Sequence, residues 1–427
     1  MQRVFVLDAH KQPLMPCHPA RARELLRKGK AAVYRRQPFT IILKERVGGD
    51  TQPLTLKLDP GSKTTGMALV ASFKRGRGVI WAALLNHRGR RIQALLLARR
   101  QIRRRRRHRK TRYRPRRFDN RKRPEGWLPP SLWSRVANIV TWVRRLQRWT
   151  PLTDLAMELV KFDTQKLLNP EISGVEYQQG ELLGYEVREY LLEKWQHRCA
   201  YCGVENVPLQ VEHIVPKARG GSNRVSNLAW ACDPCNDAKG RRTAEEFGHP
   251  QVQQQALQPL RDMASVHATR WALYRVLQTI GRPLETGTGG RTQFNRTPQE
   301  YPKSHWIDAA CVGTSGQKVQ LALKHVPLTA QAMGWGSRQM CRVDAYGFPR
   351  TTAKRSKQVH GFQTGDLVQA LVPQGKKAGV HQGRVAVRAS GSFRVGPVDG
   401  ISWRTCRRLQ ATDGYAYRWG EAASSPA

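Results

Sequence analysis

Acidic side chains are scarce in this sequence of 427 residues, which has 31 Asp and Glu against 74 Lys and Arg. The formal net charge of +43 at pH 7 would make the chain repel itself unless a polyanion neutralised it. A well-solvated basic surface accounts for a small excess of charge, but not for one of this size. An anionic membrane is the alternative partner, yet the chain lacks a long basic amphipathic helix with a bulky apolar face. The charge therefore predicts a nucleic-acid partner.

Long apolar runs are also missing. No stretch reaches the roughly 18 apolar residues that a transmembrane helix needs, so we expect no membrane partner. The short apolar run near the N-terminus is interrupted by Asp8, which argues against a signal peptide. No internal repeats are visible. These absences favour a cytoplasmic protein.

Cysteine is infrequent, and half of the eight cysteines form two Cys-x2-Cys pairs 29 residues apart: Cys199, Cys202, Cys232 and Cys235. A secreted disulfide framework would be denser and more evenly spaced, so we expect reduced thiols. Four thiolates with this spacing can close a tetrahedral structural Zn²⁺ site, whereas a chance pattern or a redox pair is the alternative. The segment between the pairs is long enough to hold an inserted working module.

The first 87 residues have the pattern of short strands. Residues 1–50 predict a small α+β unit, with a helix that ends at Gly29. Leucines at every second position from Leu54 predict a half-buried strand with Asp59 at its far end. Gly61 and Gly66 are expected to form a turn into a second strand, and a third follows at 78–87. Together the three strands suggest an antiparallel meander.

A dense run of basic residues follows, in which 16 of the 25 residues from Arg99 to Arg123 are Arg or Lys. Runs of this kind are usually solvated tails, but this one is internal and continues a helical apolar seam at Ile92, Leu95, Leu96 and Ile102. Arginines dock phosphates through bidentate hydrogen bonds. We therefore predict a helix that binds RNA through Arg99, Arg100, Arg103, Arg104, Arg105, Arg106, Arg107, Arg109 and Arg112.

Later segments alternate between helices and buried strands. Apolar residues at helical spacing predict a helix over 129–149, and 153–163 is typical of a buried strand that carries Glu158. Further helices are expected over 181–195 and 259–281. From about 325 the chain is rich in glycine and short strands, which is typical of a small β-barrel.

The segment between the cysteine pairs contains "VEHIVPKARGGSNRVSNLAW", followed by "CDPCNDAKG". Over about 45 residues this resembles the HNH nuclease family, which has a ββα-metal fold. The resemblance implies that His213 is the general base, that Glu212 and Asn236 hold Mg²⁺ (or Mn²⁺), and that Asn227 orients the hairpin. Many members have Asp before the histidine, whereas this chain has Glu212, which is one methylene longer. We expect the cysteines to hold this module together because a hairpin and a helix bury little core.

Four further residues, Asp59, Glu158, His305 and Asp308, are far apart in the sequence but lie at expected strand ends or on a short helix. Each alone could be a surface charge. Together they resemble the RNase H-like fold of RuvC-type nucleases, in which the first strand ends in Asp, a later strand carries Glu and a helix brings a third acid. The resemblance implies that Asp59, Glu158 and Asp308 bind Mg²⁺ and clamp a scissile phosphate.

The order of these features resembles the IscB family of transposon-encoded RNA-guided nucleases, including the "PLMP" stretch near the N-terminus. The implied fold class is an α+β multidomain protein in which an RNase H-like (RuvC) domain is split by an arginine-rich bridge helix and a zinc-stabilised HNH domain, with a β-rich C-terminal domain. The implied parts are 1–50 (PLMP), 51–87, 126–180 and 259–324 (RuvC-like), 88–125 (bridge helix), 181–258 (HNH) and 325–427 (RNA and target-adjacent motif).

That resemblance implies a monomer that carries a structured guide RNA, binds double-stranded DNA beside a short adjacent motif and lies on the nucleoid when it is bound. The HNH site would cut the guide-paired strand and the RuvC-like site the displaced strand. Two alternatives remain open: a stand-alone HNH endonuclease that reads DNA directly, and a catalytically inactive RNA-binding protein.

Overall fold

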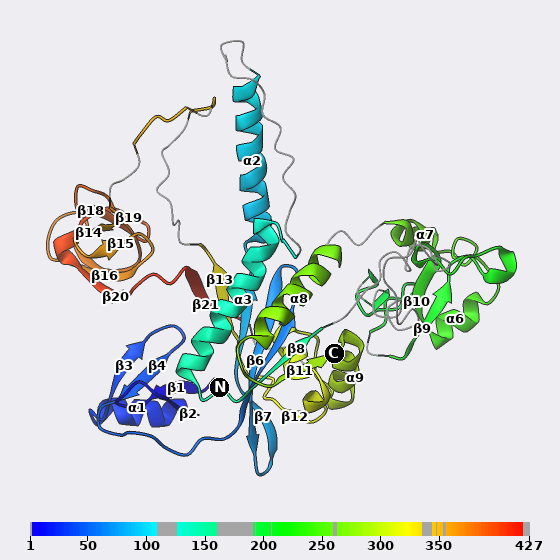
Figure 1. Cartoon of the computed structure of the whole chain (residues 1–427), viewed down its shortest axis with the longest axis horizontal. Helices are drawn as coiled ribbons and strands as arrows, with labels where there is room; N and C mark the ends of the chain where they lie inside the picture. The colour runs from blue at the N-terminus through cyan, green and yellow to red at the C-terminus, as the bar shows by residue number, and fades with distance from the viewer. Residues whose placement is uncertain are drawn as a thin grey trace. The chain divides into compact units, whose positions relative to one another are not determined.

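The computed structural model describes residues 2–108, 126–159, 191–192, 194–205, 207–258, 263–334, 344–346, 348–352 and 356–421 (Figure 1). The chain divides into two compact units. Unit 1 is drawn from Met1–Gln52, Ala83–Leu152 and Val326–Glu421, and unit 2 from Pro53–Ala82 and Thr153–His325. Within the described ranges, no helix is long and apolar enough to cross a membrane.

Unit 1 begins with a four-stranded sheet in the order β2-β1-β4-β3. Its strands are β1 (Val4–Leu7), β2 (Pro13–Cys17), β3 (Ala31–Arg35) and β4 (Thr40–Leu43), and helix α1 (Pro19–Arg27) joins β2 to β3. The helix stops where Gly29 adopts a positive φ of 70°, a conformation that glycine enters without steric cost. The α+β unit expected over residues 1–50 is therefore present.

Two long helices of unit 1, α2 (Gly89–Arg107) and α3 (Pro130–Trp149), pack against each other. The predicted apolar stripe of α3 is buried at Val136, Ile139, Val140, Val143 and Leu146. The seam of α2 is only partly covered, since Ile92, Leu96 and Ile102 are half-buried and Leu95 is exposed. Residues 109–125 of the expected bridge helix lie outside the described residues.

The C-terminal part of unit 1 contains a five-stranded antiparallel sheet in the order β19-β18-β17-β16-β20. The strands are β16 (Leu367–Val372), β17 (Gly379–Ala386), β18 (Ser392–Val395), β19 (Val398–Ser402) and β20 (Cys406–Gln410), beside a small hairpin of β14 (Gln358–Val359) and β15 (Phe362–Gln363). Its core contains Phe362, Val368 and Phe393. These strands agree with the β-rich region expected after about residue 325.

One strand lies outside its expected part. β13 (Leu328–Ala332) follows the boundary placed at residue 325, yet it pairs in parallel with Ala83–Asn86 of β7 and antiparallel with β21 (Tyr415–Trp419). The first residues of the expected C-terminal region therefore extend a sheet that begins before residue 90.

The sheet of unit 2 places β5 (Leu54–Pro60) between β6 (Thr64–Phe73) and β8 (Asp154–Glu158). β6 is antiparallel to β5, as expected, whereas β8 is parallel to β5, and β11 (Leu284–Gly287) is parallel to β8. β7 (Gly76–Asn86) follows β6, and β12 (Val319–Gln320) pairs with its start. Residues 160–163 of the strand expected over 153–163 lie outside the described residues.

Two expectations for the start of this sheet are wrong. β5 is not half-buried, because it is a central strand of the sheet. Even Lys57 is fully buried, and its Nζ donates a hydrogen bond to the Val312 carbonyl at 2.7 Å. Gly66 is not in the turn but inside β6, opposite Asp59. The turn itself closes through a hydrogen bond from Gly61 N to Thr64 O.

The helices of unit 2 outside the nuclease-like module are α8 (Met263–Gln278), α9 (Gly289–Arg296) and α10 (His305–Ala310). α10 packs against both β5 and β6. Short 3₁₀ turns occur at Lys217–Arg219, Val225–Asn227, Thr297–Gln299, Thr314–Gly316 and Trp403–Thr405. Most of the helix expected over 181–195 falls outside the described residues.

Between β8 and α8, unit 2 contains the hairpin of β9 (Leu209–His213) and β10 (Leu228–Cys232), then α6 (Asp233–Lys239) and α7 (Pro250–Leu257). This is the expected ββα arrangement. The expectation that it buries little core is wrong. Apolar side chains of the hairpin and of α7 join Trp195 and Tyr201 in one buried cluster, so the cysteines are not alone in holding the module.

Candidate active sites

The first candidate site lies where β5 and β8 end. These strands are parallel neighbours with Leu58 opposite Met157, so the residues that follow, Asp59 and Glu158, reach the same edge of the sheet. Both carboxylates are buried, with 6% and 5% of the residue exposed. The sheet topology therefore brings together two acids that are about a hundred residues apart in the sequence.

Helix α10 supplies the two remaining expected residues. His305 Nδ1 lies 2.8 Å from Asp59 Oδ2, and 51% of the His305 side chain is exposed. Asp308 lies one helical turn later. α10 comes this close because position 66 is glycine: a Cβ there would lie 1.7 Å from the His305 carbonyl oxygen. All four residues singled out in the sequence thus lie at one place, which we call the carboxylate site.

Two buried arginines that the sequence patterns did not reveal neutralise this site. Arg270 Nη2 donates to Glu158 Oε1 at 2.8 Å and lies 4.0 Å from Asp59 Oδ1. Arg296 Nε lies 3.0 Å from Asp308 Oδ1. Both arginines are at most 3% exposed. A basic residue on a helix is normally a surface charge, so only the tertiary structure identifies them as site residues.

The electrostatics of the carboxylate site fit a divalent cation. Burial, together with the nearby charge of Asp59, raises the pKa of Asp308 to about 6. The hydrogen bond to Asp59 raises the pKa of His305 to about 9, although burial opposes this. A cation favours the charged form of a buried carboxyl such as Asp308, and hard oxygen ligands suit Mg²⁺ or Mn²⁺. Asp59, Glu158 and Asp308 are therefore a chemically suitable ligand set.

The second candidate site lies on the β9–β10 hairpin and α6. Glu212 is buried, and its carboxylate accepts hydrogen bonds from Tyr201 Oη and Lys239 Nζ, each at 2.5 Å. Lys239 is 1% exposed and also donates to the His213 carbonyl at 3.0 Å. The sequence patterns missed Lys239 and Tyr201, although Lys239 lies in the quoted "CNDAKG". The expected metal ligand Glu212 is thus already bound to a buried cation.

His213 follows Glu212 on the strand, and successive side chains of a strand point to opposite faces. Its Nε2 lies 3.0 Å from Asn223 Oδ1 on the exposed side of the hairpin. Asn236, the other expected ligand, is half-buried on α6 and donates from Nδ2 to Gln210 Oε1 at 3.1 Å. His213 and Asn236 are thus partly open to solvent while Glu212 faces inward.

Asn227 ties the ends of the loop between β9 and β10. Its Oδ1 accepts from Val215 N at 2.9 Å, and its Nδ2 donates to the Val215 and Ser222 carbonyls at 3.0 and 2.9 Å. Gly221 makes this closure possible, since a Cβ there would lie 1.7 Å from the Val215 oxygen. These bonds fix the loop that follows His213, and the orienting role that the family resemblance implies for Asn227 stays a prediction.

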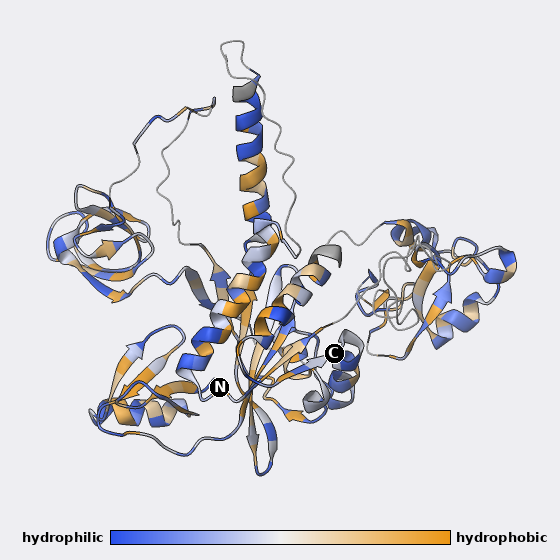
Figure 2. Ribbon diagram, in the orientation of Figure 1, coloured by the Kyte–Doolittle hydropathy of each residue, from blue (hydrophilic) through white to orange (hydrophobic). Residues whose placement is uncertain are grey.

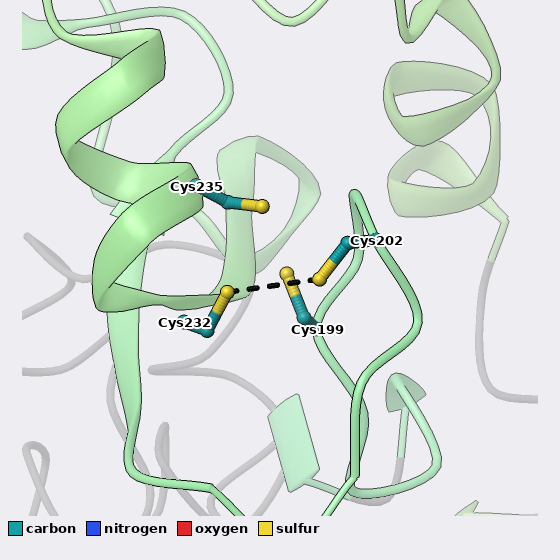
Figure 3. A group of neighbouring side chains, drawn as sticks. All are labelled: Cys199, Cys202, Cys232 and Cys235. Atoms are coloured by element: carbon teal, nitrogen blue, oxygen red, sulfur yellow. Dashed lines mark hydrogen bonds between the residues drawn. The ribbon is translucent and has the colours of Figure 1, made fainter.

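The four paired cysteines converge, as Figure 3 shows. Their sulfur atoms all lie within 4.8 Å of one another, and Cys202 Sγ lies 3.7 Å from Cys232 Sγ. Burial and neighbouring thiols raise the pKa of Cys235, whereas backbone hydrogen bonds lower that of Cys199 to about 7 despite its burial. Such a thiol cluster fits a tetrahedral zinc ion, which would stabilise all four thiolates. In the part of the chain that the structure describes, no other group of three or more His, Cys, Asp or Glu has ligand atoms this close together.

The basic residues of α2 face solvent. Figure 2 shows most of this helix as hydrophilic, with a hydrophobic band in its first half. Arg99, Arg100, Arg103, Arg104 and Arg105 are exposed. The side chains of Arg106 and Arg107, and all of Arg109 and Arg112, lie outside the described residues. The exposed guanidinium groups of α2 can contact phosphates, and their role in binding RNA stays a prediction.

Comparison with protein families identifies two segments. Residues 199–251, which contain the thiol cluster, His213 and α6, match the model of the HNH endonuclease family. We call this segment the HNH endonuclease domain, after the family model that it matches. Residues 4–180, which contain the arginine helix, match the model described as RRXRR protein. The HNH endonuclease domain supports nuclease activity, and both matches support a nucleic-acid partner.

Comparison with whole proteins adds less. No curated protein matches the chain. Among solved structures, Streptococcus thermophilus Cas9 in complex with the AGAA PAM is similar at 12% identity and a TM-score of 0.21, over 60% of this chain and 32% of that one. The Type II-C Cas9 enzyme from Actinomyces naeslundii is similar at 19% identity and a TM-score of 0.16, over 42% and 24%. The chain spans about a third or less of those proteins, and such TM-scores do not establish a shared fold.

Proposed function

We propose that the chain is an RNA-guided endonuclease of the IscB kind that cuts both strands of a DNA duplex. One observation carries the proposal: a chain with a net charge of +43 contains two separate clusters in which buried acids lie beside a histidine. One site needs only the HNH endonuclease domain. The other draws residues from both ends of unit 2. A stand-alone HNH endonuclease has no need of the second site.

In the HNH endonuclease domain, His213 is the general base, because its side chain is partly exposed and its ring is oriented by the contact between Nε2 and Asn223 Oδ1. Asn227 holds the loop that follows it. Glu212 and Asn236 are the proposed ligands of a Mg²⁺ or Mn²⁺ ion, which stabilises the leaving oxygen when it is bound. Glu212 takes this role only when its carboxylate turns from Lys239. The thiol cluster binds structural Zn²⁺.

At the RuvC-like carboxylate site, Asp59, Glu158 and Asp308 are the proposed Mg²⁺ ligands. His305 lies beside them with half of its side chain exposed, so it can reach a phosphodiester or its attacking water. The proposed RNase H-like fold is supported by an Asp at the end of the first strand, a Glu on its parallel neighbour and a third acid on a helix. The HNH site would cut the guide-paired strand, and the carboxylate site the displaced strand.

A structured guide RNA is the proposed ligand of the arginines on α2, and its phosphates would offset the net charge. Base pairing would select the target, while the C-terminal region would contact the RNA and an adjacent DNA motif. The resulting ribonucleoprotein would contain one copy of the chain.

The deciding experiment expresses the full chain together with RNA transcribed from the DNA that flanks its gene, purifies the protein and sequences the RNA that is bound to it. We expect one discrete RNA. Cleavage of a duplex that matches the guide should be lost after RNase treatment and regained on adding that RNA back. A guide of scrambled sequence is the control. Cleavage that survives RNase treatment would instead establish an endonuclease that reads DNA directly.

A further inference from the structure

Arg270 occupies an unusual position for a positive charge in a site built from acids. It comes from α8, and its guanidinium is anchored by a hydrogen bond from Nε to the Pro60 carbonyl at 3.0 Å. Pro60 directly follows Asp59 on β5. From this anchor, Nη2 reaches Glu158 on the neighbouring strand. The arginine therefore bridges the ends of the two strands that carry the acids.

The guanidinium lies where it competes with a metal ion. Nη2 is 2.8 Å from Glu158 Oε1 and 4.0 Å from Asp59 Oδ1, so one group contacts or approaches both carboxylates. Among the described residues, the four cysteines have ligand atoms that all lie within 4.8 Å of one another, whereas the oxygen atoms of the carboxylate site are not gathered so closely. Glu158 Oε1 already accepts a hydrogen bond from Arg270, so this oxygen would be shared between the arginine and any metal ion bound by the three carboxylates.

The charge balance leads to the same conclusion. Asp59, Glu158 and Asp308 are three acids, and Arg270 and Arg296 already place two fixed positive charges beside them. A positive charge beside the ligands of a divalent ion repels that ion. A permanently charged arginine in this position must therefore weaken metal binding.

We propose that Arg270 is the resident counter-ion of the carboxylate site: it positions Glu158 and Asp59 in the free protein and lowers the affinity of the site for divalent metal. This inference rests on the proposed role of these acids as metal ligands. The HNH endonuclease domain has no part in it, so its metal requirement stays unchanged.

The test measures Mn²⁺ binding to the full chain, washed free of nucleic acid at high salt, by electron paramagnetic resonance of the unbound ion. The binding event that Asp59→Ala removes identifies the carboxylate site. Arg270→Gln should raise Mn²⁺ affinity there about tenfold or more, whereas Arg270→Lys, which keeps the charge, should stay nearer to wild type. If Gln does not fold, Arg270→Met, which keeps the apolar stem, replaces it.

A second readout separates a counter-ion from a merely structural residue. Removing a buried cation takes away the hydrogen bond from Arg270 to Glu158 and a positive charge near Asp59, so Arg270→Gln should melt at a lower temperature than wild type in EDTA. Mn²⁺ should then raise the melting temperature of Arg270→Gln more than that of wild type, because a ligand that binds more tightly stabilises the folded protein more. A purely structural loss would lower the melting temperature equally with and without metal.

The outcomes are distinguishable. Tighter Mn²⁺ binding with the larger thermal shift supports the inference. Unchanged or weaker binding in Arg270→Gln, with the site still lost in Asp59→Ala, overturns the counter-ion role and leaves the proposed function standing. Equal Mn²⁺ binding in wild type and Asp59→Ala overturns both, because the acids would then bind no metal.

Discussion

The two candidate sites draw their residues from very different lengths of chain. In the HNH endonuclease domain, every residue of the site and of the thiol cluster falls within 199–251. At the carboxylate site, Asp59 and His305 are in contact across 246 residues of sequence. The first site depends on local geometry and a short motif, whereas the second depends on correct assembly of a whole sheet and its helices.

The sites nevertheless solve one problem in the same way. Each has a buried acid held by a buried cation from a helix later in the chain: Lys239 of α6 for Glu212, and Arg270 of α8 for Glu158. A buried carboxylate without a partner would be strongly destabilising. The comparison shows that acids expected to bind metal are also the residues that a metal-free fold must neutralise.

Loss of zinc should separate the two sites most sharply. Cys232→Ser should remove about one zinc ion per chain and unfold the HNH endonuclease domain, since apparent zinc binding in small domains amounts to about 10 kcal/mol. Because unit 2 keeps its sheet, the carboxylate site should survive. Elemental analysis and limited proteolysis measure the effects, with Cys406→Ser as the control. Active wild-type protein without zinc would refute the four-thiolate assignment.

Removing one catalytic group from each site should convert a double cut into a nick. His213→Ala should lower cleavage of the guide-paired strand by roughly 10³-fold, because a general base contributes that order of rate. Asp59→Ala should do the same to the displaced strand. End-labelled duplexes resolve the two strands, and supercoiled plasmid reports the nick. If either change abolished both cuts, the sites would not be independent.

Acid should lower the stability of unit 2 through His325. This histidine packs on Trp306 of α10, with the ring centroids 5.6 Å apart. Burial lowers the pKa of His325 to about 4. The unfolded chain, with a histidine pKa of about 6.5, therefore binds a proton that the folded chain does not. His325 by itself therefore lowers the free energy of unfolding by up to about 3 kcal/mol as the pH falls from about 6.5 to 4, and the raised pKa of Asp308 offsets part of this loss.

Thermal unfolding from pH 7.5 to pH 5 measures this loss, and His325→Gln should flatten its slope. The comparison of slopes, rather than of absolute melting temperatures, allows for the packing that the variant loses at every pH. A variant with the wild-type slope would show that another group controls the acid response.

Changes in the arginine helix α2 should affect cleavage at the two sites equally. Replacing Arg100, Arg103 and Arg104 with Ala should lower RNA affinity by about tenfold and flatten its log–log salt slope by about 0.7 for each lost phosphate contact. Both strand cuts should fall together, because they share one RNA. A matched triple Lys variant should retain most of the slope. Unchanged RNA affinity with impaired cleavage would assign α2 to DNA.

Much of this could be predicted from the sequence because the informative signals are short. The ββα order, the cysteine spacing and the stripe of α3 all depend on neighbours within a few turns or strands. The strand-end positions of Asp59 and Glu158 also follow from local pattern. Their convergence followed from a family resemblance, not from any periodicity, and the sheet register accounts for it.

Most of the residues that escaped prediction share one property: apart from Tyr201, they are basic side chains buried by tertiary structure. Lys57, Lys239, Arg270 and Arg296 would each be assigned to the surface by composition alone. Each is stabilised by a carbonyl or carboxylate that comes from another segment. In a chain with so many basic residues, no local pattern distinguishes these few from the rest.

Gly66 has a further consequence for anyone who wishes to engineer this nuclease. The strand meets the helix backbone there with no room for one carbon atom, so α10 rests directly on β6. The residue carries no side chain, yet it sets the gap between Asp59 and the pair His305 and Asp308. A series of larger side chains at this position would act as a graded spacer, and would measure how many tenths of an ångström of misalignment the reaction tolerates.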